Sequence, residues 1–271
     1  MLAWVDGCPE DSLSLRDRGL AYGDGVFETI AVSKGQPLLF ERHLQRLETS
    51  CDRLAIPVDQ VLLRTEMTRF AAQLGDGVMK LILTRGDSQR GYAPAPDTQS
   101  RRILQGSAAP AYPSAHAGQG VRLFPCKTRL AEQPLLAGLK HLNRLEQVLA
   151  RSEWQDSEYA EGLMCDTSGR VIEGVYSNLF LVRDGVLLTA DLSRCGVAGV
   201  MRAELLDQAR NQGIAVDIRD LHLSDLEQAD ELFLCNSVYG VWPVRGFSRL
   251  NWPVGPLTRK LQDIARALLD N

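Results

Sequence analysis

The stretch GSAAPAYPSAHAGQG, residues 106–120, divides the sequence into two parts. Three glycines, two prolines and mostly small residues are typical of a connection rather than of a helix or strand. We therefore predict a smaller N-terminal α/β domain at residues 1–106, an interdomain connection at residues 107–120 and a larger C-terminal domain at residues 121–271. A chain of 271 residues can bury the cores that this division requires.

On the N-terminal side of the connection, apolar periodicity and turn residues predict both strands and helices. One helix, whose apolar residues recur at every third or fourth position, ends before Pro57. A second helix is expected over residues 61–74, and Gly75 ends it. Strands are expected at residues 2–6, 25–32, 78–84 and 102–105.

On the C-terminal side, strands and helices follow one another without regular alternation, which favours an α+β fold over a doubly wound sheet. Asp184 and Gly185 predict a tight hairpin between two of the strands. Helices are expected at residues 143–153, 201–212 and 257–269. Strands are expected at residues 121–126, 161–166, 178–182, 186–189, 215–218 and 231–235.

The composition disfavours several classes of protein. A net charge of −4 without a basic tract predicts no nucleic-acid partner. No apolar run approaches the length of a membrane span, and the N-terminus lacks the pattern of a signal peptide, so we expect no membrane association. The six cysteines form no C-x-x-C pair and indicate buried free thiols in a cytoplasmic protein. The four dispersed histidines show no zinc-ligand spacing, so no metal is expected.

Lysine is scarce in this sequence, which narrows the search for a nucleophilic amine. Only five of the 30 basic residues are lysines, and arginine, which suits fixed recognition of carboxylates and phosphates, supplies the rest. Lys140 lies in LKHLN, where partial burial between leucines would lower the pKa of its amine and make it nucleophilic. From these surroundings alone, a position on the surface stays open. The other lysines are Lys34, Lys80, Lys127 and Lys260.

Two glycine-rich stretches are candidates for binding an anion. The first, GLAYGDGVFET at residues 19–29, has Glu28 in place of the third glycine of G-x-G-x-x-G, so a tight turn into a strand is favoured. The second, GVAGVMR at residues 196–202, precedes a helical pattern whose first backbone N–H groups could face an anion. Here a capping turn and a phosphate site both remain open.

One carboxylate lies among apolar residues. Glu173 is part of VIEGVYSNLF, residues 171–180, where a carboxylate is either a satisfied structural group or a functional one. Its separation from Lys140 along the chain allows both to lie at the mouth of one sheet.

Five segments occur along the chain in a fixed order: YGDGVFET (22–29), HLQRL (43–47), Lys140, EGVYSNLF (173–180) and CGVAGVMR (195–202). Together they resemble the fold-type IV enzymes that depend on pyridoxal 5'-phosphate (PLP), a group with branched-chain aminotransferases, D-amino-acid aminotransferases and aminodeoxychorismate lyases. The segments span nearly the whole chain, and their order is far more specific than any one of them. The resemblance implies a two-domain α+β fold, like that of D-amino-acid aminotransferases, with PLP bound by the larger C-terminal domain.

Within this group the chain is most similar to the aminodeoxychorismate lyases. The matching segments are AGLKHLNRLEQVL (137–149), RG (85–86), RGY (90–92) and QADE (228–231), with Cys235 and Asn236 following. Branched-chain enzymes typically carry a tyrosine five residues after the lysine, where this chain has Leu145. The resemblance implies a lyase of folate synthesis that converts 4-amino-4-deoxychorismate to 4-aminobenzoate and pyruvate. A D-amino-acid or branched-chain-type aminotransferase is the alternative, and a PLP-binding protein without catalysis is disfavoured.

The resemblance also implies which residues meet the cofactor ring. Lys140 would carry PLP through a covalent bond to its amine, and Glu173 would pair with the ring nitrogen and keep it protonated. Val197 would pack on the face of the ring. Thr29, close to the lysine in the lyase pattern, would assist in handling protons.

The cofactor phosphate and the substrate have their own implied contacts. The phosphate would be bound by Arg46 and by the backbone N–H groups of Val200 and Met201. Ser237, which stands where relatives often have threonine, would add a hydroxyl. Arg90 and Tyr92 would contact a substrate carboxylate. The same resemblance implies a homodimer that acts on a small molecule.

The assignment of Lys140 predicts the outcome of chemical trapping. The purified protein should absorb in the near-visible, and borohydride should fix the cofactor on a single peptide that contains Lys140. Peptide mapping by mass spectrometry identifies the modified lysine. Labelling of Lys80 or Lys127 instead would contradict the assignment.

Overall fold

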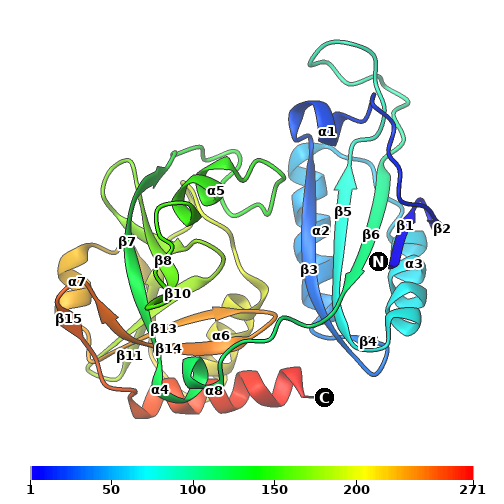
Figure 1. Cartoon of the computed structure of the whole chain (residues 1–271). Helices are drawn as coiled ribbons and strands as arrows, with labels where there is room; N and C mark the ends of the chain where they lie inside the picture. The colour runs from blue at the N-terminus through cyan, green and yellow to red at the C-terminus, as the bar shows by residue number, and fades with distance from the viewer. Residues whose placement is uncertain (1, 271) are drawn as a thin grey trace. The chain divides into compact units, whose positions relative to one another are not determined.

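The computed structural model describes residues 2–270, and the chain forms two units (Figure 1). The first unit comprises residues 2–110 together with Leu139–Asn143. The second comprises Ala111–Gly138 and Arg144–Asp270. The five-residue segment Leu139–Asn143 therefore belongs to the first unit, although the residues on both sides of it belong to the second, a return of the chain that the sequence pattern did not indicate.

An antiparallel sheet forms the centre of the first unit. In spatial order its strands are β2 (Cys8–Pro9), β1 (Leu2–Val5), β6 (Arg101–Ser107), β5 (Gly77–Thr84), β3 (Gly25–Ser33) and β4 (Gln36–Pro37). Along β3 the buried residues Val26, Ile30 and Val32 alternate with half-buried ones, the pattern of a strand with one face on a core. Glu28 occupies the remaining buried position on that face, so its carboxylate needs partners inside the unit.

Two helices, α2 (Phe40–Leu54) and α3 (Gln60–Leu74), cover the sheet and complete this core. Asp59 begins α3, because its side chain accepts a hydrogen bond from Leu62 N at 2.9 Å. The ring of Phe70, which is fully buried, meets Trp4 of β1 edge-on with 5.4 Å between ring centroids. The helices also contribute Leu47, Cys51, Leu63, Met67 and Ala71 to the core.

A short helix, α1 (Arg18–Tyr22), precedes β3 where the sequence indicated only a tight turn. The Asp17 carboxylate accepts hydrogen bonds from Gly19 N at 2.8 Å and Leu20 N at 3.3 Å, which satisfies the first N–H groups of the helix. Gly23 ends it with φ of 66°, a left-handed conformation that glycine adopts without strain. The glycine-rich stretch therefore serves as the end of a helix and the entry to β3.

The second unit contains a nine-stranded mixed sheet. Its path runs β12 (Val216–Arg219), β11 (Val186–Ala190), β10 (Asn178–Arg183), β13 (Glu231–Asn236), β14 (Gly240–Phe247), β7 (Val121–Leu130), β8 (Tyr159–Asp166) and β9 (Val171–Gly174), and β15 (Leu250–Asn251) pairs with β14. An additional pairing joins β9 to β10, so the strands from β10 to β9 close on themselves. The unit is therefore barrel-like, and the closing pair is Glu173 with Asn178.

Helices surround this barrel-like sheet. They are α4 (Ser114–Gln119), α5 (Leu145–Arg151), α6 (Val200–Asn211), α7 (Leu223–Glu227) and α8 (Pro256–Leu269). Pro256 is the first residue of α8, where its missing N–H costs nothing. The helix α6 packs against β13 and α8.

The α+β prediction is confirmed, and most helices and strands form where the periodicity placed them. Three predictions were wrong in part. The expected connection contains the helix α4, whose His116 ring lies 4.7 Å from that of Trp242. The helix expected at residues 143–153 is the shorter α5. Cys8 is exposed, whereas the other thiols are buried as predicted. The division at residues 106–120 stays a prediction.

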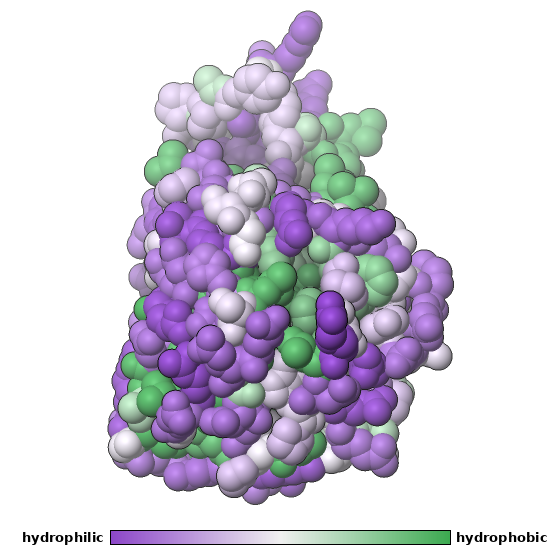
Figure 2. Space-filling view, turned by 90° about the vertical axis from the view of Figure 1, so that its left-hand side faces the viewer, coloured by the Kyte–Doolittle hydropathy of each residue, from purple (hydrophilic) through white to green (hydrophobic). Residues whose placement is uncertain are grey.

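The surface of the second unit is mostly polar on the face that Figure 2 shows. Hydrophilic residues cover most of this view, and hydrophobic residues emerge in small areas between them. Among residues 2–270, no helix is long and apolar enough to cross a membrane.

The core of the first unit predicts a large effect at Phe70. Phe70→Ala removes a fully buried ring from its contact with Trp4 and should lower the free energy of unfolding by about 3–5 kcal/mol. Val61→Ala, an exposed change on the same helix, should stay within about 0.5 kcal/mol of the parent. Urea unfolding followed by far-UV circular dichroism measures both, and equal effects would contradict the described core.

Candidate active site

The lysine identified from the sequence lies beside β3. Phe27 N donates to Lys140 O at 2.9 Å, and Leu142 N donates to Gly25 O at 3.0 Å. The Lys140 Nζ atom lies 4.3 Å from the centroid of the Phe27 ring, a distance at which an ammonium is attracted to the ring face. The backbone pairing fixes the residue, and the aromatic ring holds its amine.

Thr29 belongs to the same face of β3 as Phe27, because side chains two residues apart on a strand point the same way. It is half-buried and pairs across the sheet with Lys80 of β5. Lys80 Nζ lies 5.3 Å from the Phe27 ring, slightly farther than Lys140 Nζ. Phe27 was not predicted from the sequence, although an aromatic residue two positions before the proposed threonine was the available signal.

The opposite face of β3 carries a buried ion cluster. Arg46 Nε donates to Glu28 Oε1 at 2.8 Å, and Arg46 Nη2 forms a short contact with Glu28 Oε2. His43 Nδ1 lies 2.6 Å from the same Oε2. Arg46 and His43 lie on α2, one turn apart, so the helix places both over one carboxylate.

Burial and the neighbouring charges act in opposite directions on the pKa of Glu28. Burial acts to raise the pKa of Glu28, but the Arg46 guanidinium and His43 outweigh it and lower the pKa to about 2. Burial lowers the pKa of His43; Glu28 opposes this, and the positive charges of Arg46 and Lys140 add to it. Arg46 therefore binds Glu28, a partner that the sequence analysis did not foresee.

In the second unit, Glu173 lies on β9 with only 4% of its surface exposed. Its Oε2 accepts hydrogen bonds from Val197 N at 2.9 Å and from Asn178 Nδ2 at 3.3 Å. Asn178 Nδ2 also donates to Val197 O at 2.9 Å, so one amide connects the carboxylate to the Val197 backbone. Two donors on one oxygen favour the ionised carboxylate.

Backbone geometry brings the glycine-rich segment against this carboxylate. Gly138 N donates to Gly196 O at 2.9 Å, and Ala198 N donates to Gly138 O at 3.0 Å. A Cβ on Gly199 would lie 2.0 Å from Asn178 Oδ1, so only glycine fits there. Asn178 was missed in the sequence analysis, although it directly follows the EGVYS segment that contains Glu173.

The helix α6 begins directly after this segment. Gly199 is the residue before the helix, and no side chain caps it. The backbone N–H groups of Val200 and Met201 therefore belong to the first turn, where unpaired donors and the helix dipole favour an anion. Ser237 lies in the turn that joins β13 to β14 and is half-buried.

The structure thus groups the predicted residues within each unit. In the first unit Lys140 lies against Phe27, on the strand that carries Thr29. In the second, Glu173 and Val197 share a hydrogen bond, and Val197 leads directly into α6.

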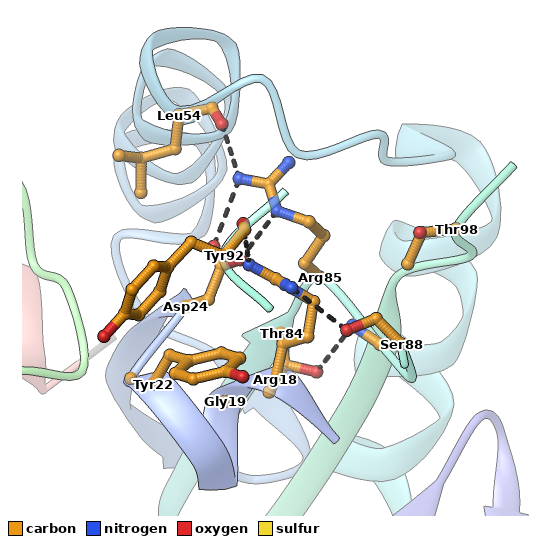
Figure 3. A network of polar contacts seen from close by, with 12 residues as sticks. Arg18, Gly19, Tyr22, Asp24, Leu54, Thr84, Arg85, Ser88, Tyr92 and Thr98 are labelled. Carbon is orange, nitrogen blue, oxygen red and sulfur yellow. Dashed lines mark hydrogen bonds and ion pairs between the residues drawn. The ribbon is translucent and has the colours of Figure 1, made fainter. Parts of the chain in front are cut away.

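The two predicted substrate residues lie on the long loop between β5 and β6. Arg90 is exposed, and Tyr92 is 85% exposed. The Tyr92 ring lies 5.4 Å from the ring of Tyr22 on α1, tilted by 57°. Gly91 separates the two residues on this loop, and Arg18 of α1 binds the loop backbone at Tyr92 O, as Figure 3 shows.

Comparison with known proteins gives a consistent result. Residues 25–247 match the family described as amino-transferase class IV. The crystal structure of 4-amino-4-deoxychorismate lyase from Pseudomonas aeruginosa is 64% identical, with 100% of both chains covered and a TM-score of 0.98. Aminodeoxychorismate lyase of Vibrio harveyi is 39% identical, with 96% of this chain and 97% of the relative covered. A D-alanine aminotransferase of Listeria monocytogenes is 28% identical, with 92% and 88% covered.

The buried cluster around Glu28 predicts how stability changes in acid. The folded pKa of about 2 is lower than the ordinary value of 4.5, so the stabilisation by this carboxylate is complete above pH 4.5 and declines toward pH 2. Its full size is roughly 3 kcal/mol. In Glu28→Gln this part of the pH dependence should be absent.

Urea unfolding at about pH 5 and about pH 3 measures the difference. Glu41→Gln on the same helix is the matched control, because its ion pair with Arg64 is exposed and contributes little. An unchanged slope in Glu28→Gln would show that the carboxylate is not held as an ion in the folded protein.

Proposed function

The chain belongs to the class IV aminotransferase family, and we propose that it acts as a 4-amino-4-deoxychorismate lyase, a PLP-dependent enzyme that releases 4-aminobenzoate and pyruvate. The observation that carries the proposal is the match to a lyase over the full length of both chains, with a TM-score of 0.98. Leu145, in place of the tyrosine expected in branched-chain aminotransferases, agrees with it.

The donor types of the chain fit PLP. An aldehyde needs an amine, which Lys140 supplies; a protonated ring nitrogen needs a buried carboxylate, which Glu173 supplies. A phosphate needs N–H donors, and the first turn of α6 offers them at Val200 and Met201. When bound, PLP would supply an electron sink that makes loss of a proton from the adjacent carbon of the substrate feasible.

Lys140 is proposed to hold the cofactor and then act as the base. Its neutral amine takes the proton from the carbon that bears the substrate amine. The bond from the ring to the enolpyruvyl oxygen then breaks, and the released enolpyruvate gains a proton on carbon to become pyruvate. The ring becomes aromatic and keeps its amino group, so no amino acceptor is consumed.

Thr29 and Phe27 support this proton transfer in the proposal. Phe27 holds the protonated amine over its ring, and the Thr29 hydroxyl on the same strand face passes protons to and from it. Loss of the hydroxyl should slow the chemical step more than it weakens substrate binding.

The remaining roles follow the family pattern. Val197, whose backbone N–H binds Glu173, would pack on the ring face, and Ser237 would add a hydroxyl at the phosphate. Arg46 is proposed to bind the phosphate while its Nε and Nη2 pair with Glu28. A guanidinium has five N–H donors, so both tasks are compatible.

Arg90 and Tyr92 are proposed to bind a carboxylate of the substrate. The guanidinium offers a bidentate contact, and the tyrosine hydroxyl adds a second donor.

We further propose that the enzyme is a cytoplasmic homodimer. The free cysteines support the cytoplasmic location. The exposed apolar side chains of Leu145, Val148 and Leu149 on α5 support a surface for association of two subunits.

The assay that tests the proposal supplies the substrate directly. With 4-amino-4-deoxychorismate the enzyme should form equal amounts of 4-aminobenzoate and pyruvate without a keto acid, as measured by chromatography.

Thr29→Ala should lower kcat about 10²-fold or more with little change in KM. Glu173→Gln should retain the cofactor but lose most activity.

The rival function makes the opposite prediction. An aminotransferase would convert D-alanine with 2-oxoglutarate and leave 4-amino-4-deoxychorismate unchanged. That result would overturn the lyase proposal while leaving the cofactor assignment intact.

A further inference from the structure

A buried arginine, Arg18, makes three hydrogen bonds to the loop that carries Arg90 and Tyr92. This loop connects β5 to β6, and it contains no helix or strand of its own. Gly91 has φ of 120°, a conformation that other residues rarely adopt, and a Cβ there would meet nothing within 4 Å. The loop tip therefore packs loosely, and its position depends on a few specific polar contacts.

Arg18 supplies those contacts, as Figure 3 shows. Its Nη1 donates to Ser88 Oγ at 3.0 Å and to Gly91 O at 3.1 Å, and its Nη2 donates to Tyr92 O at 2.7 Å. The side chain is 4% exposed, so each donor needs a partner inside the protein. The carbonyl groups of Gly91 and Tyr92, the two residues that follow Arg90, thus depend on one guanidinium.

The Arg18 guanidinium is itself held by Asp24, which Arg85 also binds. Arg18 Nε donates to Asp24 Oδ2 at 2.7 Å, and Arg85 Nε donates to the same oxygen at 2.8 Å. Arg85 continues to the end of α2, where its Nη2 donates to Leu54 O at 2.7 Å and its Nη1 to Ala55 O at 2.6 Å. Asp24 therefore links the loop anchor to the helix that carries Arg46.

Tyr22 adds a second restraint to the same place. Its hydroxyl accepts a hydrogen bond from Gly91 N at 3.3 Å. Its ring lies 5.0 Å from the Arg18 guanidinium carbon and 5.4 Å from the Tyr92 ring. The rings and the guanidinium restrict the loop at Gly91 and Tyr92 while the Tyr92 side chain stays accessible.

The beginning of the loop is held separately. Arg101 Nη1 pairs with Asp17 at 2.8 Å and with Asp87 at 2.5 Å, and Thr84 Oγ1 donates to Asp17 Oδ2 at 2.8 Å. Loss of the Arg18 contacts should therefore loosen residues 88–92, where the bonds from Ser88 N to Arg16 O at 3.2 Å and from Gly91 N to the Tyr22 hydroxyl remain, and leave the base of the loop in place.

We propose that Arg18 is a positioning residue for substrate recognition, which holds Arg90 and Tyr92 in place through the carbonyl groups of Gly91 and Tyr92. The inference rests on the proposed function, in which Arg90 and Tyr92 bind a substrate carboxylate. A mobile loop must be ordered each time substrate binds, whereas an anchored loop presents its side chains in advance. Lysine cannot replace the anchor, because a single ammonium lacks the planar fork that serves Asp24, Ser88 and two carbonyls.

The test uses Arg18→Lys in the holoenzyme, a change that keeps the positive charge beside Asp24. Arg18→Met is the stronger variant, and Arg16→Met, an exposed arginine of the same segment, is the matched control. Hydrogen exchange should quicken about tenfold or more at the amides of Ser88 and Gly91, which donate to Arg16 O and to the Tyr22 hydroxyl, in both Arg18 variants and not in the control. KM for 4-amino-4-deoxychorismate should rise roughly tenfold or more, with kcat and the cofactor absorbance near the parent values.

The outcomes separate the anchor from the function. Unchanged exchange at residues 88–92 in Arg18→Lys and Arg18→Met would overturn the anchor. Faster exchange with an unchanged KM would overturn its part in recognition, and an equal loss of kcat with altered cofactor absorbance would indicate a general structural role. If the parent enzyme fails to convert 4-amino-4-deoxychorismate, the proposed function fails, and hydrogen exchange still decides whether Arg18 holds the loop.

Discussion

Two backbone hydrogen bonds to β3, one accepted by Lys140 and one donated by Leu142, are the constraint on which the rest of the candidate site depends. They hold Leu139–Asn143 in the first unit, while Gly138 is bonded to Gly196 and Ala198 in the second. Because the strand pleat sends alternate side chains to opposite faces, this pairing sets the lysine amine against Phe27 and on the face of Thr29. The chemistry proposed for the lysine begins with this register.

Each unit also buries a carboxylate whose partners are supplied by the fold of that unit. Glu28 is surrounded by Arg46 and His43 from α2, and Glu173 accepts from Asn178 and from the Val197 backbone. Unpaired carboxylates at these depths would be protonated or would destabilise the fold. Glu28 is thus held as an anion within the first unit, and the donors on Glu173 favour the ionised form that a protonated pyridine nitrogen needs.

Local periodicity was sufficient to predict most of the regular structure, because β3, α2 and α3 each repeat apolar residues with the period of their own geometry. The strand β14 was missed, since Gly240, Pro243 and Gly246 interrupt its pattern; Pro243 is accommodated opposite Phe233. The helix α1 was missed because it has only five residues, and its Asp17 cap was not recognised.

The candidate site was only partly predictable for a different reason. Lys140 and Glu173 stood out by residue type and surroundings, and the family resemblance supplied their roles. The pairings of Glu28 with Arg46, of Glu173 with Asn178 and of Arg18 with the loop carbonyls join residues from separate elements, so no local pattern contains them. Three-dimensional packing decides such contacts, and only the structure reveals them.

The lyase reaction removes the enolpyruvyl group and leaves the amino group on the ring. Mass spectrometry can follow the nitrogen during turnover of 4-amino-4-deoxychorismate labelled with ¹⁵N at the amine, in the presence of excess 2-oxoglutarate. We expect complete retention of the label in 4-aminobenzoate. Label recovered in glutamate would contradict it, because the amino group would then have been transferred.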